Sequence, residues 1–235
     1  MRDEGSLISF VYGLEGGRRL VHFFQEFLDT FDIFLKGMGW TFLVTFVSVL
    51  IALVIGLFFA ILKISGIKAL EWIANTYIFV VRGTPLIAQI FIFYFGLASL
   101  NISDFWSVAM GLAFHNGAYI AEILRGSIQS IDKGQREAGR SLGMSQGLTM
   151  RRIILPQAFR RALPPLGNQF IIALKDSSLA SFIGMYELFN VATTLGSNNF
   201  DNMTYLLIVS VYYLVLVYLF TFIVQRLEKR MSISD

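Results

Sequence analysis

The sequence of 235 residues contains no cysteine, and charged residues make up only 15% of it. The absence of cysteine excludes disulfides, thiolate metal sites and cysteine nucleophiles. A Gly-x-x-x-x-Gly-Lys-Ser/Thr phosphate loop is also absent, so any hydrolysis of ATP must be carried out by another polypeptide. No set of side chains has the spacing of metal ligands or of a nucleophile with its base, and nothing indicates nucleic-acid binding. We therefore predict that the chain is not an enzyme.

Apolar residues are abundant instead. Hydrophobic residues account for 55% of the chain, 23 residues are phenylalanine, and the mean hydropathy is +0.64. This is more apolar surface than a soluble domain of this length could bury, so we predict an integral membrane protein. Because crossing the hydrocarbon core takes roughly 20 residues, and because the period-two alternation of a barrel is absent, the apolar runs predict an all-α fold with five membrane-spanning helices. The predicted spans are 38–62, 70–98, 105–124, 164–184 and 203–225.

The basic residues between the spans predict the orientation of the chain. The loop 125–161 contains eight arginines and lysines against only two acidic residues, Asp132 and Glu137. Lysines and arginines also follow the first and the last span, whereas the connections 99–104 and 185–202 contain none. Because positively charged short loops stay in the cytoplasm, we expect the loop 125–161 and the carboxyl terminus to be cytoplasmic and the amino terminus to face outward.

The spans divide the chain into three predicted parts. Residues 1–36 have apolar side chains at helical spacing and acidic ones on another face, as in a helix that lies in the membrane interface, and they lack the pattern of a signal peptide. Residues 37–226 are expected to form the transmembrane domain, which includes the cytoplasmic loop 125–161. Residues 227–235 are expected to form a cytoplasmic tail.

The cytoplasmic loop has an internal order that its charge alone does not explain. Residues 127–142 are typical of a helix that Gly143 can end, since glycine adopts a left-handed conformation without steric cost. Ser145 is a suitable N-cap for a second, short helix that reaches Ile154, and Pro156 is expected to break the chain just after it. Two helices joined by a tight turn predict a compact knob, which we interpret as the part that docks a soluble partner.

The knob follows the pattern Glu-Ala-Ala, three residues, Gly, nine residues, Ile-any-Leu-Pro. The matching residues are Glu137, Ala138, Gly143, Ile153, Leu155 and Pro156. The single departure is Gly139 in place of the second alanine. In this pattern the chain resembles the membrane subunits of bacterial ABC importers. Within residues 38–226, further stretches are similar to the polar amino acid subfamily of these permeases, namely Arg82–Leu86, Asn116–Tyr119, Glu122–Gly126 and Lys175–Leu179.

The resemblance implies a fold of the type I importer kind and a function as a permease subunit for a polar amino acid, multi-pass in the bacterial cell membrane and in contact with its lipid. It implies that the knob is the coupling helix, which fits a groove on a cytoplasmic ABC ATPase and passes the closure of that ATPase to the spans. ATP and Mg would be used by the ATPase, and this chain would bind no cofactor. The other implied partners are an extracytoplasmic amino-acid-binding protein and a second permease subunit, in a homodimer or a heterodimer.

Ionisable residues inside the predicted spans need a partner, a cavity or a place near the headgroups, because a charge at the bilayer centre costs about 2.5–3.5 kcal/mol. Counted from the start of the second span, Arg82 lies about 18 Å deep. Alternatively, residues 70–81 lie flat at the interface and Pro85 begins the true span, with Arg82 as its anchor. Both positions of Arg82 remain open on the sequence alone.

Lys175 and Asp176 lie near the middle of the fourth predicted span and point about 100° apart, so they are expected to face separate partners or a polar cavity. An amino acid offers both an ammonium and a carboxylate. We hypothesise that Asp176 receives the ammonium and Arg82 the carboxylate, with two serines donating hydrogen bonds. The other side chains assigned to this substrate pathway are Thr84, Gln89, Lys175, Ser177 and Ser178. The alternative is a polar network that only ties the spans together.

Two further ionisable sites have simpler expectations. Glu122 and Arg125 lie three residues apart on a predicted helix, a spacing that favours an ion pair near the cytoplasmic face. His115 is expected to be a packing residue without a function. A different class of protein, an ion-coupled secondary transporter of a small polar solute, would use Glu122 or His115 as its proton group. That alternative leaves the basic knob unexplained.

Overall fold

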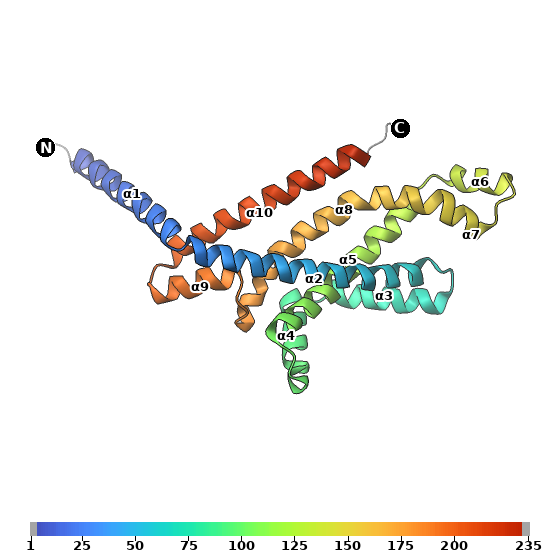
Figure 1. Ribbon diagram of the computed structural model, residues 1–235, viewed down its shortest axis with the longest axis horizontal. Coiled ribbons are helices and arrows are strands. Elements are labelled where there is room, and N and C mark those ends of the chain that lie inside the picture. Colours follow the sequence, from blue (N-terminus) through green and yellow to red (C-terminus); the bar gives the residue numbers. More distant parts are fainter. Residues whose placement is uncertain (1–3, 232–235) are drawn as a thin grey trace.

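The computed structural model describes the backbone of residues 4–231 and the side chains of residues 17–230, and Figure 1 shows their arrangement. All regular structure in this part of the chain is helical, which confirms the predicted all-α class. The helices are α1 Glu4–Asp29, α2 Phe31–Ile64, α3 Lys68–Arg82, α4 Leu86–Gly96, η1 Ala98–Leu100, α5 Asp104–Gln129, α6 Lys133–Ser141, α7 Gln146–Thr149, η2 Met150–Ile154, α8 Leu155–Asp176, η3 Ser177–Ile183, α9 Leu188–Asn198 and α10 Asn202–Met231.

Two of the helices in the described residues, α2 and α10, are long and apolar enough to cross a membrane. They contain the predicted spans 38–62 and 203–225. A third span is obtained if α3 and α4, which meet at an angle of 102°, are counted together. The other predicted spans coincide with α5 and with α8 continued by η3. The count of five spans and the orientation of the termini stay predictions.

The close packing of α2 against α5 forms the centre of the structure. Small buried residues recur every four positions on both helices, as Ala52, Gly56 and Ala60 on α2 and as Ala113, Gly117 and Ala121 on α5. A Cβ atom on Gly56 would lie 2.5 Å from Cγ2 of Ile120, and one on Gly117 would lie 2.7 Å from Cγ2 of Ile55. In a membrane, helices are not driven together by the hydrophobic effect, because the lipid tails are as apolar as the side chains. Stripes of small residues allow the helix backbones to approach closely and to associate through packing instead.

Buried polar groups join the remaining helices to this pair. The side-chain amide of Gln169 on α8 donates to the amide oxygen of Asn116 on α5 over 2.7 Å. Both side chains are buried, and a buried polar group that lacked such a partner would carry a desolvation cost. The hydrogen bond therefore fixes how α8 crosses α5, and it gives Asn116 a structural role.

Glu187 is the most buried carboxylate of the described residues, with no solvent exposure. It accepts hydrogen bonds from the backbone N–H groups of Phe189 and Asn190 at the start of α9 and from the Tyr213 hydroxyl of α10, 3.0 Å away. Thr41 of α2 accepts from the backbone N–H of Leu188 at the same place. Glu187 thus caps α9 and ties it to α2 and α10. Residues 185–202 were predicted only as an outer connection, so this helix was not expected.

The predicted second span is interrupted. α3 ends at Arg82, Gly83 caps it, and α4 begins at Leu86 after Pro85. Proline disfavours the helical conformation in the residue that precedes it, so the helix stops there. Figure 1 shows α3 beside the carboxyl-terminal half of α2, and Tyr77, Ile78 and Val81 pack against α2 and α5.

The predicted interfacial segment 1–36 contains α1 and the start of α2. α1 ends at Asp29 and α2 begins at Phe31, so residues 31–36 are continuous with the first long helix, and the extent of the interfacial segment stays a prediction. Leu20, Phe24 and Leu28 of α1 are exposed, whereas Phe27 stacks on Tyr212 of α10 at 5.4 Å. Residues 1–3 of the predicted interfacial segment and residues 232–235 of the predicted tail lie outside the described residues.

Candidate functional site: the knob and the broken helix

The predicted knob is built from α6, α7 and η2, which lie at the opposite end of the molecule from α9 (Figure 1). One boundary was wrong. Residues 127–142 are not one helix, because α5 ends at Gln129 and Asp132 begins α6 by accepting a hydrogen bond from the backbone N–H of Gly134 over 2.6 Å. An aspartate N-cap satisfies an N–H group that has no partner within the helix, so it favours a new start at this position.

The turn of the knob follows the prediction. Gly143 has φ +79°, the left-handed conformation that glycine adopts without strain, and its N–H donates to the Arg140 carbonyl over 2.9 Å. The next N–H, of Met144, donates to the Gly139 carbonyl over 3.1 Å. The Ser145 hydroxyl then accepts from the N–H of Leu148 and caps α7, as expected.

The expected break after Pro156 is absent. α7 continues through the π-helical turn η2 into α8, and Pro156 lies in the first turn of α8. Pro156 has no N–H to donate to the preceding turn, and the π-helical turn η2 directly before it is the local adjustment with which the helix continues past the proline. The knob is therefore joined to α8 by continuous helix.

The close packing around Gly139 explains why the chain has glycine at the one position where it departs from the motif. A Cβ atom at this position would lie 2.9 Å from Cγ2 of Thr149 and 3.0 Å from Cδ1 of Ile153. α6 therefore approaches η2 more closely than an alanine would allow without a shift of these neighbours. Ile153 packs in turn against a small core of Ile131, Ile154 and Ala158. The knob is thus a packed unit.

The outer surface of the knob carries the other motif residues. Glu137, Ala138, Leu155 and Pro156 are exposed. Leu142, which the sequence analysis did not assign to the site, is 81% exposed at the tip, directly before the turn at Gly143. In the sequence, the only indication that this residue belongs to the site is that a leucine ends a strongly polar helix. A rigid tip with an exposed leucine suits insertion into an apolar groove on another protein.

The broken helix α3–α4 brings two of the predicted pathway residues together. The Gln89 amide nitrogen donates to the Val81 carbonyl over 2.8 Å and to the Thr84 hydroxyl over 2.8 Å. These bonds tie the first turn of α4 to the last turn of α3. The Gln89 amide oxygen lies 3.2 Å from Nδ1 of His115 on α5, so this histidine has a polar partner that the sequence did not reveal.

Arg82 lies exposed at the end of α3. Its guanidinium carbon is 5.1 Å from the ring centroid of Tyr119 on α5, within the range of a cation–π contact. Both residues line an open cavity of about 500 Å³, together with Lys63 and Asn75. No ion pair that involves Arg82 is present among the described side chains, so its charge is available to an anion in this cavity.

Lys175, Asp176, Ser177 and Ser178 form the junction between α8 and η3. Lys175 is exposed and Asp176 is half-buried. Neither joins an ion pair within the part of the chain whose side chains are described. The hydroxyls of Ser177 and Ser178 donate to the carbonyls of Leu174 and Lys175 over 2.8 and 2.7 Å, so their protons are used at the end of α8.

The structure brings these predicted residues together only in part. Thr84 and Gln89 share a hydrogen bond, and Lys175 is the direct neighbour of Asp176. No ion pair or hydrogen bond joins Arg82 to Asp176 among the described side chains. Ser177 is fully buried, whereas Ser178 is partly exposed.

The expected pair of Glu122 and Arg125 is confirmed. Nη2 and Nε of Arg125 lie 2.8 and 3.1 Å from Oε2 of Glu122, and Lys63 of α2 contacts Oε1 of the same carboxylate. Glu122 therefore links the ends of α2 and α5. Among the described side chains, no group of three or more histidine, aspartate or glutamate residues could hold a metal ion.

Known proteins resemble this chain over most of its length. It is 42% identical over 191 residues, 80% of this chain and 84% of the relative, to the probable amino-acid ABC transporter permease protein YckA of Bacillus subtilis (strain 168). It is 40% identical over 209 residues, 86% of this chain and 94% of the relative, to the glutamine transport system permease protein GlnP of Escherichia coli (strain K12).

The fold also has a solved counterpart. The crystal structure of an amino acid ABC transporter with histidines contains a chain with a TM-score of 0.83 and 38% sequence identity, and the match covers 88% of this chain and 98% of that one. The model of the family described as binding-protein-dependent transport system inner membrane component matches residues 52–233. The chain therefore belongs to the family of binding-protein-dependent transport system inner membrane components.

Proposed function

We propose that this chain forms half of the translocation pathway for a polar amino acid in an ABC importer. The observation that carries this proposal is its likeness to the chain from an amino acid ABC transporter, at 38% identity over 88% of the residues. The chain is a non-catalytic permease subunit, and a partner hydrolyses ATP. Relatives named as amino-acid and glutamine permeases support this function and do not support the ion-coupled carrier.

The knob would supply the coupling. With its exposed Leu142 and Gly143 it would dock on a cytoplasmic ABC ATPase, and the continuous helix from η2 into α8 would carry the movement to the junction at Asp176. Closure of two ATPases would then change access to the pathway from the outside to the inside. A second permease subunit related by two-fold symmetry would form the other wall. An extracytoplasmic binding protein would deliver the amino acid to the side of α9.

The substrate would lie between the broken helix and the end of α8. Arg82 would bind the carboxylate, and Asp176 would bind the ammonium. Ser178 would accept a hydrogen bond from the ammonium, because its own proton is already donated to Lys175, and lone pairs remain on its oxygen. Thr84 and Gln89 would line the path and hold α3 and α4 at their bend.

Asp176→Asn is expected to lower ATP-driven amino acid uptake by at least about tenfold, because a charge-assisted hydrogen bond to the ammonium is replaced by a neutral one. Uptake is measured in proteoliposomes that contain the whole importer, with the binding protein and labelled amino acid outside. Asp104→Asn is the matched control, since Asp104 is an exposed aspartate at the start of α5 that is not assigned to the pathway. Normal assembly with unchanged uptake by Asp176→Asn would remove this residue from the pathway.

A further inference from the structure

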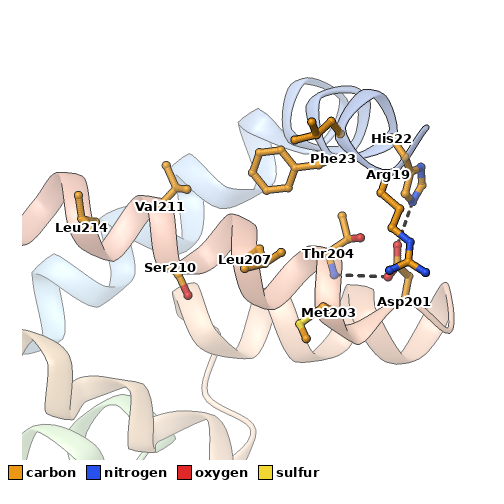
Figure 2. A pocket seen from close by; sticks show the side chains of 11 residues that line it. Arg19, His22, Phe23, Asp201, Met203, Thr204, Leu207, Ser210, Val211 and Leu214 are labelled. Carbon is orange, nitrogen blue, oxygen red and sulfur yellow. Dashed lines mark hydrogen bonds and ion pairs between the residues drawn. The ribbon is translucent and has the colours of Figure 1, made fainter. Parts of the chain in front are cut away.

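An apolar groove lies between α1 and the first half of α10, apart from the knob and the broken helix. Its volume is about 720 Å³, within the roughly 300–1,000 Å³ range of small-molecule sites. Figure 2 shows Leu207, Val211 and Leu214 of α10 along its length and Phe23 of α1 above them. Leu207 and Leu214 are 52% and 71% exposed, so no other part of the described chain covers this wall.

One end of the groove is polar. Nε2 of His22 lies 2.9 Å from Oδ2 of Asp201, and the backbone N–H of Thr204 donates to Oδ1 of Asp201. Hydrogen bonding from Thr204, with His22 adding to it, holds the pKa of Asp201 below its usual range, so this carboxylate is ionised and both its oxygens are engaged. Arg19 lines the same end and is absent from the ion pairs among described side chains. Its guanidinium is therefore free for an anionic group.

Beyond its polar end, the groove is lined mainly by apolar side chains, and the length of this part matches the depth of one membrane leaflet. Thr204 and Leu214 are ten residues apart on α10, which is about 15 Å at 1.5 Å per residue. Half of a hydrocarbon core of about 30 Å has the same depth. Because positions 207, 211 and 214 recur at helical spacing, their side chains form one continuous strip that begins at the polar end.

We propose that this groove holds one glycerophospholipid, with its phosphate at Arg19 and an acyl chain along the strip of Leu207, Val211 and Leu214. The guanidinium of Arg19 suits the phosphate, because both oxygens of the Asp201 carboxylate at the same end are already engaged by His22 and Thr204. The length of the strip suits an acyl chain in the leaflet that contains the start of α10. A second copy of this chain is the other possible occupant. Arg19 at the polar end and the mainly apolar wall that follows it lie in the same order as a phosphate and an acyl chain, which favours the lipid.

The test uses the complete importer, purified after equilibration with vesicles of phosphatidylethanolamine and phosphatidylglycerol in equal amounts. Native mass spectrometry counts the phospholipids retained per permease chain. Leu207→Trp, which fills the strip, and Arg19→Gln, which removes the cation, are each expected to lower the retained phospholipid by about tenfold. Leu219→Trp, at a position of α10 with 49% exposure outside the groove, and Arg18→Gln, at the neighbouring position of α1, are the matched controls and should retain it.

A second measurement identifies the occupant directly. Because the chain contains no cysteine, Ser210→Cys introduces a single thiol inside the groove, to which a benzophenone can be attached. Illumination is expected to add the mass of one phospholipid. A covalent adduct with a second permease chain would overturn the proposal, and so would equal lipid retention by the two groove variants and their controls.

Discussion

Leu142→Asp is expected to reduce ATP-driven uptake by at least about tenfold while the permease remains folded. The side chain is 81% exposed at the tip of the knob, so the substitution removes no internal contact of the chain. In an apolar groove of the ATPase, however, the carboxylate would be buried without a partner, which costs several kcal/mol. Uptake and ATP hydrolysis are measured together in proteoliposomes with the binding protein present.

The control for this prediction is Leu142→Met, which preserves the volume and the apolar character of the tip and should retain most of the uptake. Both variants should be recovered in equal amounts from the membrane. If Leu142→Asp supported uptake at the original rate, the tip of the knob could not be seated in a partner, and coupling through this surface would have to be abandoned.

Gly117→Leu is expected to prevent the packing of α2 against α5. A Cβ atom at this position lies 2.7 Å from Cγ2 of Ile55 and 2.8 Å from the Tyr77 hydroxyl, and the remainder of a leucine has no space beyond them. We expect the free energy of unfolding to fall by about 3 kcal/mol or more, which corresponds to a decrease in Tm of about 6–12 °C for a chain of this size. Thermal unfolding of the purified permease in detergent measures this decrease.

Gly39→Leu provides the control, because Gly39 lies on α2, the helix that packs against α5, and no atom lies within 4 Å of the position of its added Cβ. Its Tm should change by about 1–2 °C at most, as for other exposed positions. A Tm for Gly117→Leu equal to that of Gly39→Leu would contradict the close crossing of these two helices.

The sequence predicted the features that depend on local chemistry. The left-handed turn at Gly143 and the cap at Ser145 follow from backbone preferences of glycine and serine, and both were found where expected. The ion pair of Glu122 and Arg125 follows from helical spacing alone. The long apolar runs likewise predicted α2 and α10, because no alternative fold can accommodate them.

The features that the sequence did not predict depend on contacts between distant residues. Glu187 appears as one acidic residue in a connection, and only Thr41 and Tyr213, from helices far away in the sequence, make it a buried cap. Pro156 fits either a break or a helix start, and the π-helical turn before it decided in favour of continuous helix. The groove between α1 and α10 depends on the angle between two helices, which periodicity cannot give.

The residues proposed for the substrate pathway were predicted from the sequence only in part. Polar residues within apolar runs indicated Arg82, Thr84, Gln89 and Asp176, and the bend at Pro85 explains why Thr84 and Gln89 lie close together. The sequence did not reveal that His115 and Tyr119 of α5 approach the same bend. It also assigned a donor role to Ser177, whose hydroxyl is instead buried and bonded to Leu174.

We propose that the knob docks on the ATPase through its tip at Leu142. Because the chain has no cysteine, Leu142→Cys and Phe200→Cys each provide one thiol, at the tip of the knob and at a 95% exposed position at the opposite end. A short thiol-specific photocrosslinker is attached to each variant in the assembled importer, and the crosslinked partners are identified by mass spectrometry. The account predicts that position 142 captures the ATPase and that position 200 does not. Capture of the ATPase from position 200, or labelling of position 142 by a membrane-impermeant reagent added outside, would contradict it.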